Sequence, residues 1–131
     1  MIIVDSGTWV DFFNGIESPH MKRLDAALEQ EEDLAVLPII ITEVLQGFRS
    51  DTDFQRARSI LVALPTIEPS VDSHVEAARL FRLLRGKGIT VRGAVDCLIA
   101  QSCIETKAIL LSPDVDFENI ARHSTLQLWR G

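Results

Sequence analysis

The chain has 131 residues, of which 47% are hydrophobic and 24% charged, so we predict a single domain over residues 1–131 with a core that needs no disulfide. Its net charge of −6 argues against a protein that binds nucleic acid non-specifically. No apolar run approaches the ~20 residues of a membrane helix, and no basic region precedes the apolar N-terminus. We therefore expect neither a membrane segment nor a signal peptide.

Short segments that are apolar on both faces alternate along the chain with helical patterns. The apolar segments predict five strands, at residues 2–4, 34–37, 66–68, 108–111 and 126–129. The helical patterns begin near residue 8 and then cover residues 18–32, 38–49, 51–64, 70–88, 94–105 and 116–122. This alternation predicts an α/β fold, in which a parallel sheet of about five strands is covered by helices on both faces.

The same patterns predict which side chains face the interior. In the longest predicted helix, the apolar spacing places Val75, Ala78 and Leu83 toward the core. Cys97 and Cys103 lie in one predicted helix, ~9 Å apart along its axis, which is too far for a disulfide. We expect two buried free thiols and a reducing, cytoplasmic setting.

Five acidic residues follow the predicted strands. Asp5 ends the first strand, and Asp114 and Asp116 follow the fourth. Glu43 lies in the first turns of the helix after the second strand, and Asp96 lies at the start of a helix after a glycine-containing loop. Because strand ends and the helix starts that follow them share one edge of a parallel sheet, acids far apart in sequence can meet there.

Carboxylates that lie close together repel one another unless a cation sits between them. Mg²⁺ or Mn²⁺ prefers such oxygen ligands, and a metal held in this way can activate water for attack on a phosphodiester. Each acid also has a structural explanation: Asp5 as a helix cap, Glu43 as an exposed helix residue, Asp96 as a first-turn acid, Asp116 as an N-cap. The spacing alone leaves both explanations open.

Four sequence motifs point to a known family. The opening IIVDSGTWVDFF resembles that of PIN-domain proteins, particularly the VapC-like toxins of bacterial toxin–antitoxin pairs. ITEVLQGF, VRGAVDCLIA and LLSPDVDFENIA resemble the second, third and fourth acidic motifs of that family, in matching order over essentially the whole chain. The resemblance implies an α/β/α sandwich, an acidic cluster that binds Mg²⁺ or Mn²⁺, and endoribonuclease activity. It also implies a homodimer and a VapB-like antitoxin as partner.

The resemblance assigns roles to the acids. Asp5, Glu43 and Asp96 match the three core acids of the family, and Asp114 matches the fourth, with Asp116 as a second candidate. In the implied mechanism, Asp5 and Asp96 are the main metal ligands, and Asp114 and Asp116 compete for the remaining acidic position. Glu43 and Asp114 bind a second metal or orient water. Attack on phosphorus then leaves a 5′-phosphate and a 3′-hydroxyl.

Two positions depart from the family pattern. Ser6 matches the hydroxyl residue that usually follows the first acid, but Gly7 stands where Ser is frequent. Gly93 stands where Ser or Thr is frequent. Both changes remove a hydroxyl that could contact phosphate, so they affect the expected substrate contacts and not the metal cluster.

A local basic segment offers contacts for RNA. Residues 79–92 hold five of the thirteen basic residues and no acid. Arg82 and Arg85 could guide the RNA backbone toward the acids, or they could form an ordinary solvated helix face. Arg92, close to Asp96 in sequence, is the better single candidate for a phosphate contact.

Two alternative functions are less well supported by these residues, and a partner docking surface is expected. A metal-dependent phosphotransfer enzyme of the haloacid-dehalogenase type would need Asp where Gly7 stands, and a non-catalytic PIN-like binding module would not need the full set of acids. An antitoxin would place an Arg or Lys among the acids, because a cation neutralises them. Its apolar anchor would use one or two residues of an aromatic set that otherwise packs in the core: Trp9, Phe12, Phe13 and Phe48.

Overall fold

The computed structural model describes all of residues 1–131, and it is built around a parallel sheet of four strands in the order β2-β1-β3-β4. The strands are β1 (Ile2–Val4), β2 (Leu34–Ala35), β3 (Ile109–Leu111) and β4 (Gln127–Leu128). Seven helices accompany them: α1 (Ser6–Asn14), α2 (Pro19–Glu29), α3 (Pro38–Leu45), α4 (Asp51–Leu61), α5 (Val71–Gly86), α6 (Ala94–Thr106) and α7 (Val115–Arg122). The parallel α/β fold is confirmed.

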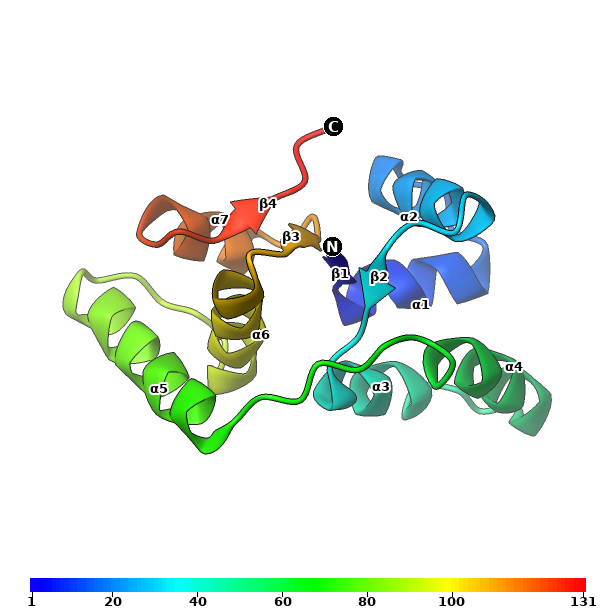
Figure 1. Cartoon of the computed structure of the whole chain (residues 1–131), viewed down its shortest axis with the longest axis horizontal. Helices are drawn as coiled ribbons and strands as arrows, with labels where there is room; N and C mark the ends of the chain where they lie inside the picture. The colour runs from blue at the N-terminus through cyan, green and yellow to red at the C-terminus, as the bar shows by residue number, and fades with distance from the viewer.

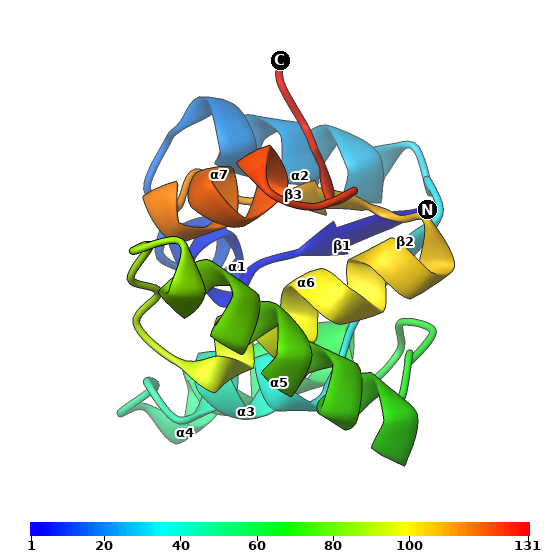
Figure 2. The ribbon, with the colours of Figure 1, turned by 90° about the vertical axis from the view of Figure 1, so that its left-hand side faces the viewer.

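The helices enclose the sheet in layers. In both views α3, α4, α5 and α6 lie below the strands (Figures 1 and 2), and Figure 2 shows α2 and α7 above β1. The strands are short and buried on both faces, with Ile3, Val4, Leu110 and Leu111 fully enclosed. Trp9 of α1 is also fully buried and stacks on Phe13 with 5.8 Å between ring centroids. None of the helices combines the length and the apolarity that a membrane crossing requires.

The predicted strand at 66–68 is wrong. Only one β-bridge forms there, between Val36 and Thr66. Val36 N–H donates to Pro65 O at 3.0 Å, and Ile67 N–H donates to Val36 O at 2.9 Å. Pro65 and Pro69 bracket the segment and have no N–H to donate, so the ladder cannot continue in either direction. The sheet therefore has four strands where about five were predicted.

The predicted inward face of α5 is also wrong. Ser73, Ala77, Leu80 and Leu84 are the buried residues, whereas Val75 and Leu83 are 46% and 48% exposed. The helix packs mainly on α6, and the Ser73 hydroxyl donates to Glu105 Oε2 of α6 at 2.7 Å. The buried face thus includes a hydrogen-bonded Ser, which a hydrophobic pattern does not detect.

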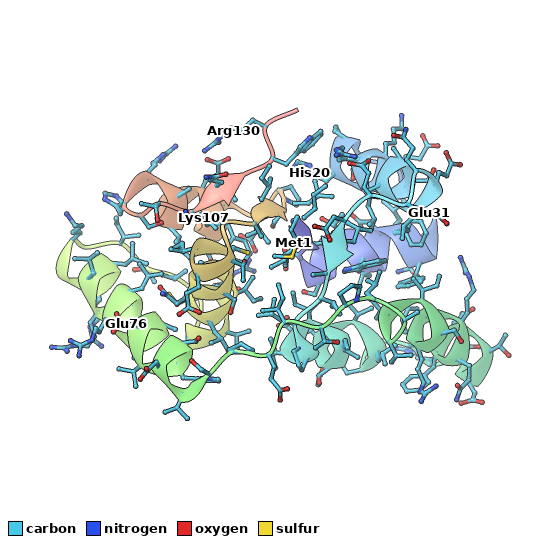
Figure 3. The ribbon with its side chains drawn as sticks, viewed as in Figure 1. Met1, His20, Glu31, Glu76, Lys107 and Arg130 are labelled. Carbon is cyan, nitrogen blue, oxygen red and sulfur yellow. The ribbon has the colours of Figure 1, made fainter.

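The helix starts were easier to predict than the helix faces. Ser18 accepts a hydrogen bond from Met21 N–H at 3.0 Å, with Pro19 at the first helical turn, as expected for an N-cap. At the other end of the chain, Lys107 (labelled in Figure 3) ends α6 in the left-handed conformation at φ 56°. This turn delivers the chain directly into β3, whose carboxyl end borders the site described next.

Candidate active site

The site begins where β1 and β3 end side by side. Val4 pairs with Leu111 in the parallel register, so the next residues, Asp5 and Ser112, are neighbours at the carboxyl edge. Asp5 is only 9% exposed, and it occupies the N-cap position of α1 without making a cap hydrogen bond. Its Oδ2 instead accepts a hydrogen bond from the Ser112 hydroxyl at 2.8 Å. The helix-cap explanation for Asp5 is therefore wrong.

Ser112 is a site residue that the sequence reasoning missed. Its side chain is buried, and its Oγ also accepts a hydrogen bond from Asp114 N–H at 3.1 Å. One hydroxyl thus ties Asp5 of the first motif to the loop that carries Asp114. The available signal was a Ser two residues before an Asp directly after a strand, a spacing typical of a hydroxyl-capped turn.

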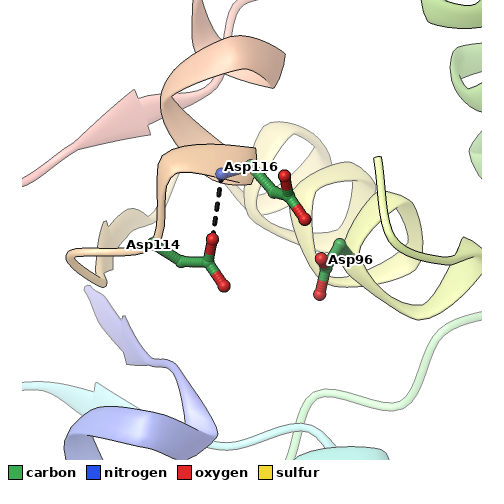
Figure 4. A group of neighbouring side chains, drawn as sticks. All are labelled: Asp96, Asp114 and Asp116. Carbon is green, nitrogen blue, oxygen red and sulfur yellow. Dashed lines mark hydrogen bonds between the residues drawn. The ribbon is translucent and has the colours of Figure 1, made fainter. Parts of the chain in front are cut away.

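Asp114, not Asp116, caps α7, the last helix. The Asp114 Oδ1 accepts a hydrogen bond from Asp116 N–H at 2.9 Å, and Asp116 lies in the first turn of α7, 7% exposed. The structural role expected for Asp116 therefore belongs to its neighbour. Figure 4 shows both carboxylates gathered with that of Asp96, and one oxygen from each of the three lies within 4.8 Å of the others.

The remaining acids reach the same place from α6 and α3. Asp96 lies in the first turn of α6, and Glu43 lies in α3 with Oε1 buried and without a hydrogen-bond partner. A single cavity of about 420 Å³ collects most of the predicted site residues. Its walls include Asp5, Ser6, Glu43, Arg92, Asp96 and Asp114.

Crowding of these acids changes their proton affinities. Burial, followed by the charges of Asp114 and Asp5, raises the pKa of Asp96 to about 6. Burial raises the pKa of Asp5 although the Ser112 hydroxyl opposes the shift, and burial together with Asp5 raises the pKa of Glu43. The cavity therefore holds more negative charge than its surroundings stabilise.

Arg92 is the positively charged side chain in the cavity wall. Its Nε donates to Asp116 Oδ2 at 3.1 Å, its backbone N–H donates to the same oxygen at 3.2 Å, and its Nη2 pairs with Asp114 Oδ2. The hydrogen bond to Asp116 and the charge of Asp114 raise the pKa of Arg92. The side chain remains 75% exposed, so it is accessible from solvent as well as from the acids.

The donor set fits a hard divalent cation. The acids present only carboxylate oxygens, the ligands that Mg²⁺ and Mn²⁺ prefer. A bound cation would give the buried Oε1 of Glu43 a partner and would offset the crowding that raises the pKa of Asp96.

Not every predicted site residue reaches the cavity. Arg82 and Arg85 are exposed on α5, outside the cavity wall, and the Arg85 guanidinium lies 5.8 Å from the Phe81 ring centroid. Arg79 of the same helix pairs with Glu76, which Figure 3 labels on α5. The contribution of Arg82 and Arg85 to RNA binding stays a prediction.

The two glycines that depart from the family pattern are not imposed by the space around them. A Cβ at Gly7 would meet Asp5 Oδ2 at 3.9 Å, an ordinary contact, and a Cβ at Gly93 would meet nothing within 4 Å. Gly93 is also extended, at φ −173°, a conformation open to any residue. A hydroxyl side chain would therefore fit at either position.

Comparison with known proteins now places the chain. The PIN domain model matches residues 2–123. The chain belongs to the PIN domain family. Among PIN-domain relatives, the VapC ribonuclease Mb1587 of Mycobacterium bovis is 32% identical over 97% of this chain and 96% of its own length. Ribonuclease VapC11 of Mycobacterium tuberculosis shows the same identity and coverage.

Solved PIN-domain structures confirm the fold. VapBC2 from Rickettsia felis, bound to a DNA fragment from its promoter, matches with a TM-score of 0.78 at 22% identity, covering 98% of both chains. VapC20 of Mycobacterium tuberculosis, a toxin that cleaves the sarcin–ricin loop, matches with a TM-score of 0.70 at 17% identity over 90% of this chain and 93% of its own. The PIN-type α/β/α sandwich expected from the four motifs is thus present.

Proposed function

We propose that this chain is an Mg²⁺- or Mn²⁺-dependent endoribonuclease toxin that cleaves RNA phosphodiester bonds and is neutralised by a VapB-like antitoxin. The observation that carries the proposal is the convergence of Asp5, Glu43, Asp96 and Asp114, from four separate segments, on one cavity in which the acids outnumber the single cationic side chain, that of Arg92. The ribonuclease names of the 32% identical relatives support the same activity.

The acids have different roles in the proposed hydrolysis. Asp5 and Asp96 are the main metal ligands, with Asp114 and Asp116 as further carboxylates beside them. A bound divalent ion would supply the positive charge that activates water and offsets the phosphate during in-line attack. Glu43 and Asp114 would orient the attacking water, and the raised pKa of Glu43 suits it to accept a proton.

The bond changes define the products. The water oxygen bonds to phosphorus while the bond from phosphorus to the 3′-oxygen breaks, and the departing 3′-oxygen takes up a proton. The products carry a 5′-phosphate and a 3′-hydroxyl.

Ser6 and Arg92 are the proposed phosphate contacts inside the cavity. Ser6 follows Asp5 directly, and its hydroxyl lies 3.4 Å from Asp5 Oδ1 at the cavity wall. Arg92 has an exposed guanidinium whose Nη1 makes no hydrogen bond, so it retains donors for a phosphate. Arg82 and Arg85 would act farther out, by drawing the RNA backbone along α5 toward the acids.

The aromatic set supports an antitoxin docking surface. Trp9 and Phe13 are buried, as expected for core residues, whereas Phe12 and Phe48 are partly exposed. Phe13 and Phe48 meet edge to face with 5.8 Å between centroids, which joins α1 to the segment after α3. An apolar antitoxin segment would bind over Phe12 and Phe48 and deliver an Arg to the acids.

A homodimer has a candidate surface of its own on α5. Val71, Val75 and Leu83 are 81%, 46% and 48% exposed, and Val95 of the neighbouring α6 is 37% exposed. Exposed apolar side chains such as these can contribute to an interface. We also place the protein in the cytoplasm, a setting in which buried free thiols such as Cys103 stay reduced.

An RNA cleavage assay tests the proposal. Asp5→Asn and Asp96→Asn should each abolish Mn²⁺-dependent cleavage, whereas Asp25→Asn, a change at an exposed acid of α2, should leave it intact. The alternatives give different results: a non-catalytic PIN-like module would bind RNA without cutting it. A phosphotransfer enzyme would transfer phosphate without shortening RNA.

A further inference from the structure

The carboxylates that line or adjoin the cavity fall into two groups that differ in what balances their charge. Asp114 and Asp116 share the guanidinium of Arg92. Asp5 and Asp96 have no cationic side chain within ion-pair distance. The cavity thus contains one part that already has a cation and one part that does not.

The first group is well satisfied by hydrogen bonds. Asp114 Oδ1 accepts from Asp116 N–H and Asp114 Oδ2 pairs with Arg92 Nη2, so both Asp114 oxygens are engaged. Asp116 Oδ2 accepts from both the backbone N–H and the Nε of Arg92. A divalent ion bound between Asp114 and Asp116 would have to displace these contacts.

The second group has unused ligand capacity. Glu43 Oε1 is buried without a partner, and Asp96 makes no side-chain hydrogen bond. Asp5 accepts hydrogen bonds from the hydroxyls of Ser112 and Ser6, and no cationic side chain pairs with it. This is the part of the cavity in which a divalent ion would gain ligands without displacing a cation.

We propose that Arg92 is a resident cation that occupies the position of a second divalent ion, so that the site takes a single ion on the side of Asp5, Glu43 and Asp96. This inference rests on the proposed metal-dependent function and fixes the number of ions that it uses. The free Nη1 of Arg92 then offers the phosphate a contact that a second ion would otherwise supply.

The test is a Mn²⁺ titration followed by the electron paramagnetic resonance signal of free Mn²⁺, with no RNA present. The wild type should bind one ion per chain, and Arg92→Gln should bind two, because Gln keeps the polar contact but removes the charge. Arg130→Gln serves as the matched control, since it breaks an exposed ion pair with Glu118 outside the acidic cavity. It should still bind one ion.

Two ions in the wild type, one ion in folded Arg92→Gln, or two ions in Arg130→Gln would each overturn the inference. A crystal structure of the wild type with Mn²⁺ provides a test that does not depend on the variant. Its anomalous signal should show one ion beside Asp5 and Asp96, with Arg92 still on Asp114 and Asp116; an ion in place of Arg92 would contradict the proposal. Absence of any Mn²⁺ binding would refute the metal-dependent function itself.

Discussion

Replacing Asp96 by Asn should make the metal-free protein more stable at neutral pH. Burial and the charges of Asp114 and Asp5 raise the pKa of Asp96 from the ordinary 3.8 to about 6, so the folded state binds its proton more tightly than the unfolded chain does. That stabilisation is complete below the ordinary pKa and is lost as the pH rises through about 6. Asn resembles the protonated acid at every pH and therefore avoids the loss.

The size of the effect follows from the difference between the two pKa values. A pKa of about 6 in place of 3.8 corresponds to a free energy of unfolding changed by about 3 kcal/mol at most. Asp96 is only half-buried, and solvent screening reduces the expected gain to about 1 kcal/mol. For a domain of this length, such a gain raises the Tm by about 3–5 °C.

Thermal unfolding in EDTA measures this gain. Asp96→Asn should melt above the wild type at about pH 7.5, and the difference should shrink at about pH 4.5, where the wild-type carboxyl is largely protonated. Asp25→Asn, at an exposed position, should match the wild type at both pH values. A lower Tm for Asp96→Asn at neutral pH, or an equal gain at both pH values, would refute the reasoning about carboxylate crowding.

Three further changes test other parts of the account. Ser112→Ala should cost about 1–3 kcal/mol of stability, because Asp5 Oδ2 loses its buried donor, and should weaken Mn²⁺ binding; an unchanged urea midpoint would count against the Ser112 link. Val75→Glu should weaken self-association in analytical ultracentrifugation with a stability change within about 0.5 kcal/mol, and unaltered association would exclude this face of α5. Replacing Arg82 and Arg85 by Ala should weaken RNA binding and reduce the slope of log K against log salt concentration by about 1–2. Equal slopes for the variant and the wild type would show that these arginines form an ordinary solvated helix face.

The meeting of the acids could be predicted because it depends on topology. In a parallel sheet, the residue after each strand and the start of the following helix share one edge, whatever the exact strand lengths. Asp5, Glu43 and Asp114 converge for this reason even though the predicted strand at 66–68 does not form. Asp96 joins them because α6 ends at the start of β3 and so begins near the carboxyl edge of the sheet. Hydrophobic patterns give the order of the strands and helices, and that order was sufficient to predict that the acids meet.

Details decided by single polar contacts could not be predicted from the patterns. The buried face of α5 includes Ser73, whose hydroxyl donates a hydrogen bond to Glu105, and a hydrophobic pattern does not register such a bond. Asp114 and Asp116 are both good capping residues in sequence, and only the start of α7 decides between them. The absence of a strand at residues 66–68 could have been predicted only from the prolines on either side, Pro65 and Pro69, which cannot donate ladder hydrogen bonds.

The chemical ends of the cleaved RNA test the central claim most directly. If metal-bound carboxylates such as Asp5 and Asp96 direct water at phosphorus, every product should carry a 5′-phosphate and a 3′-hydroxyl, and EDTA should prevent cleavage until Mn²⁺ is restored. Products that end in a 2′,3′-cyclic phosphate, formed in EDTA as readily as in Mn²⁺, would show that the RNA 2′-hydroxyl attacks instead. That result would contradict a catalytic role for the acidic cavity.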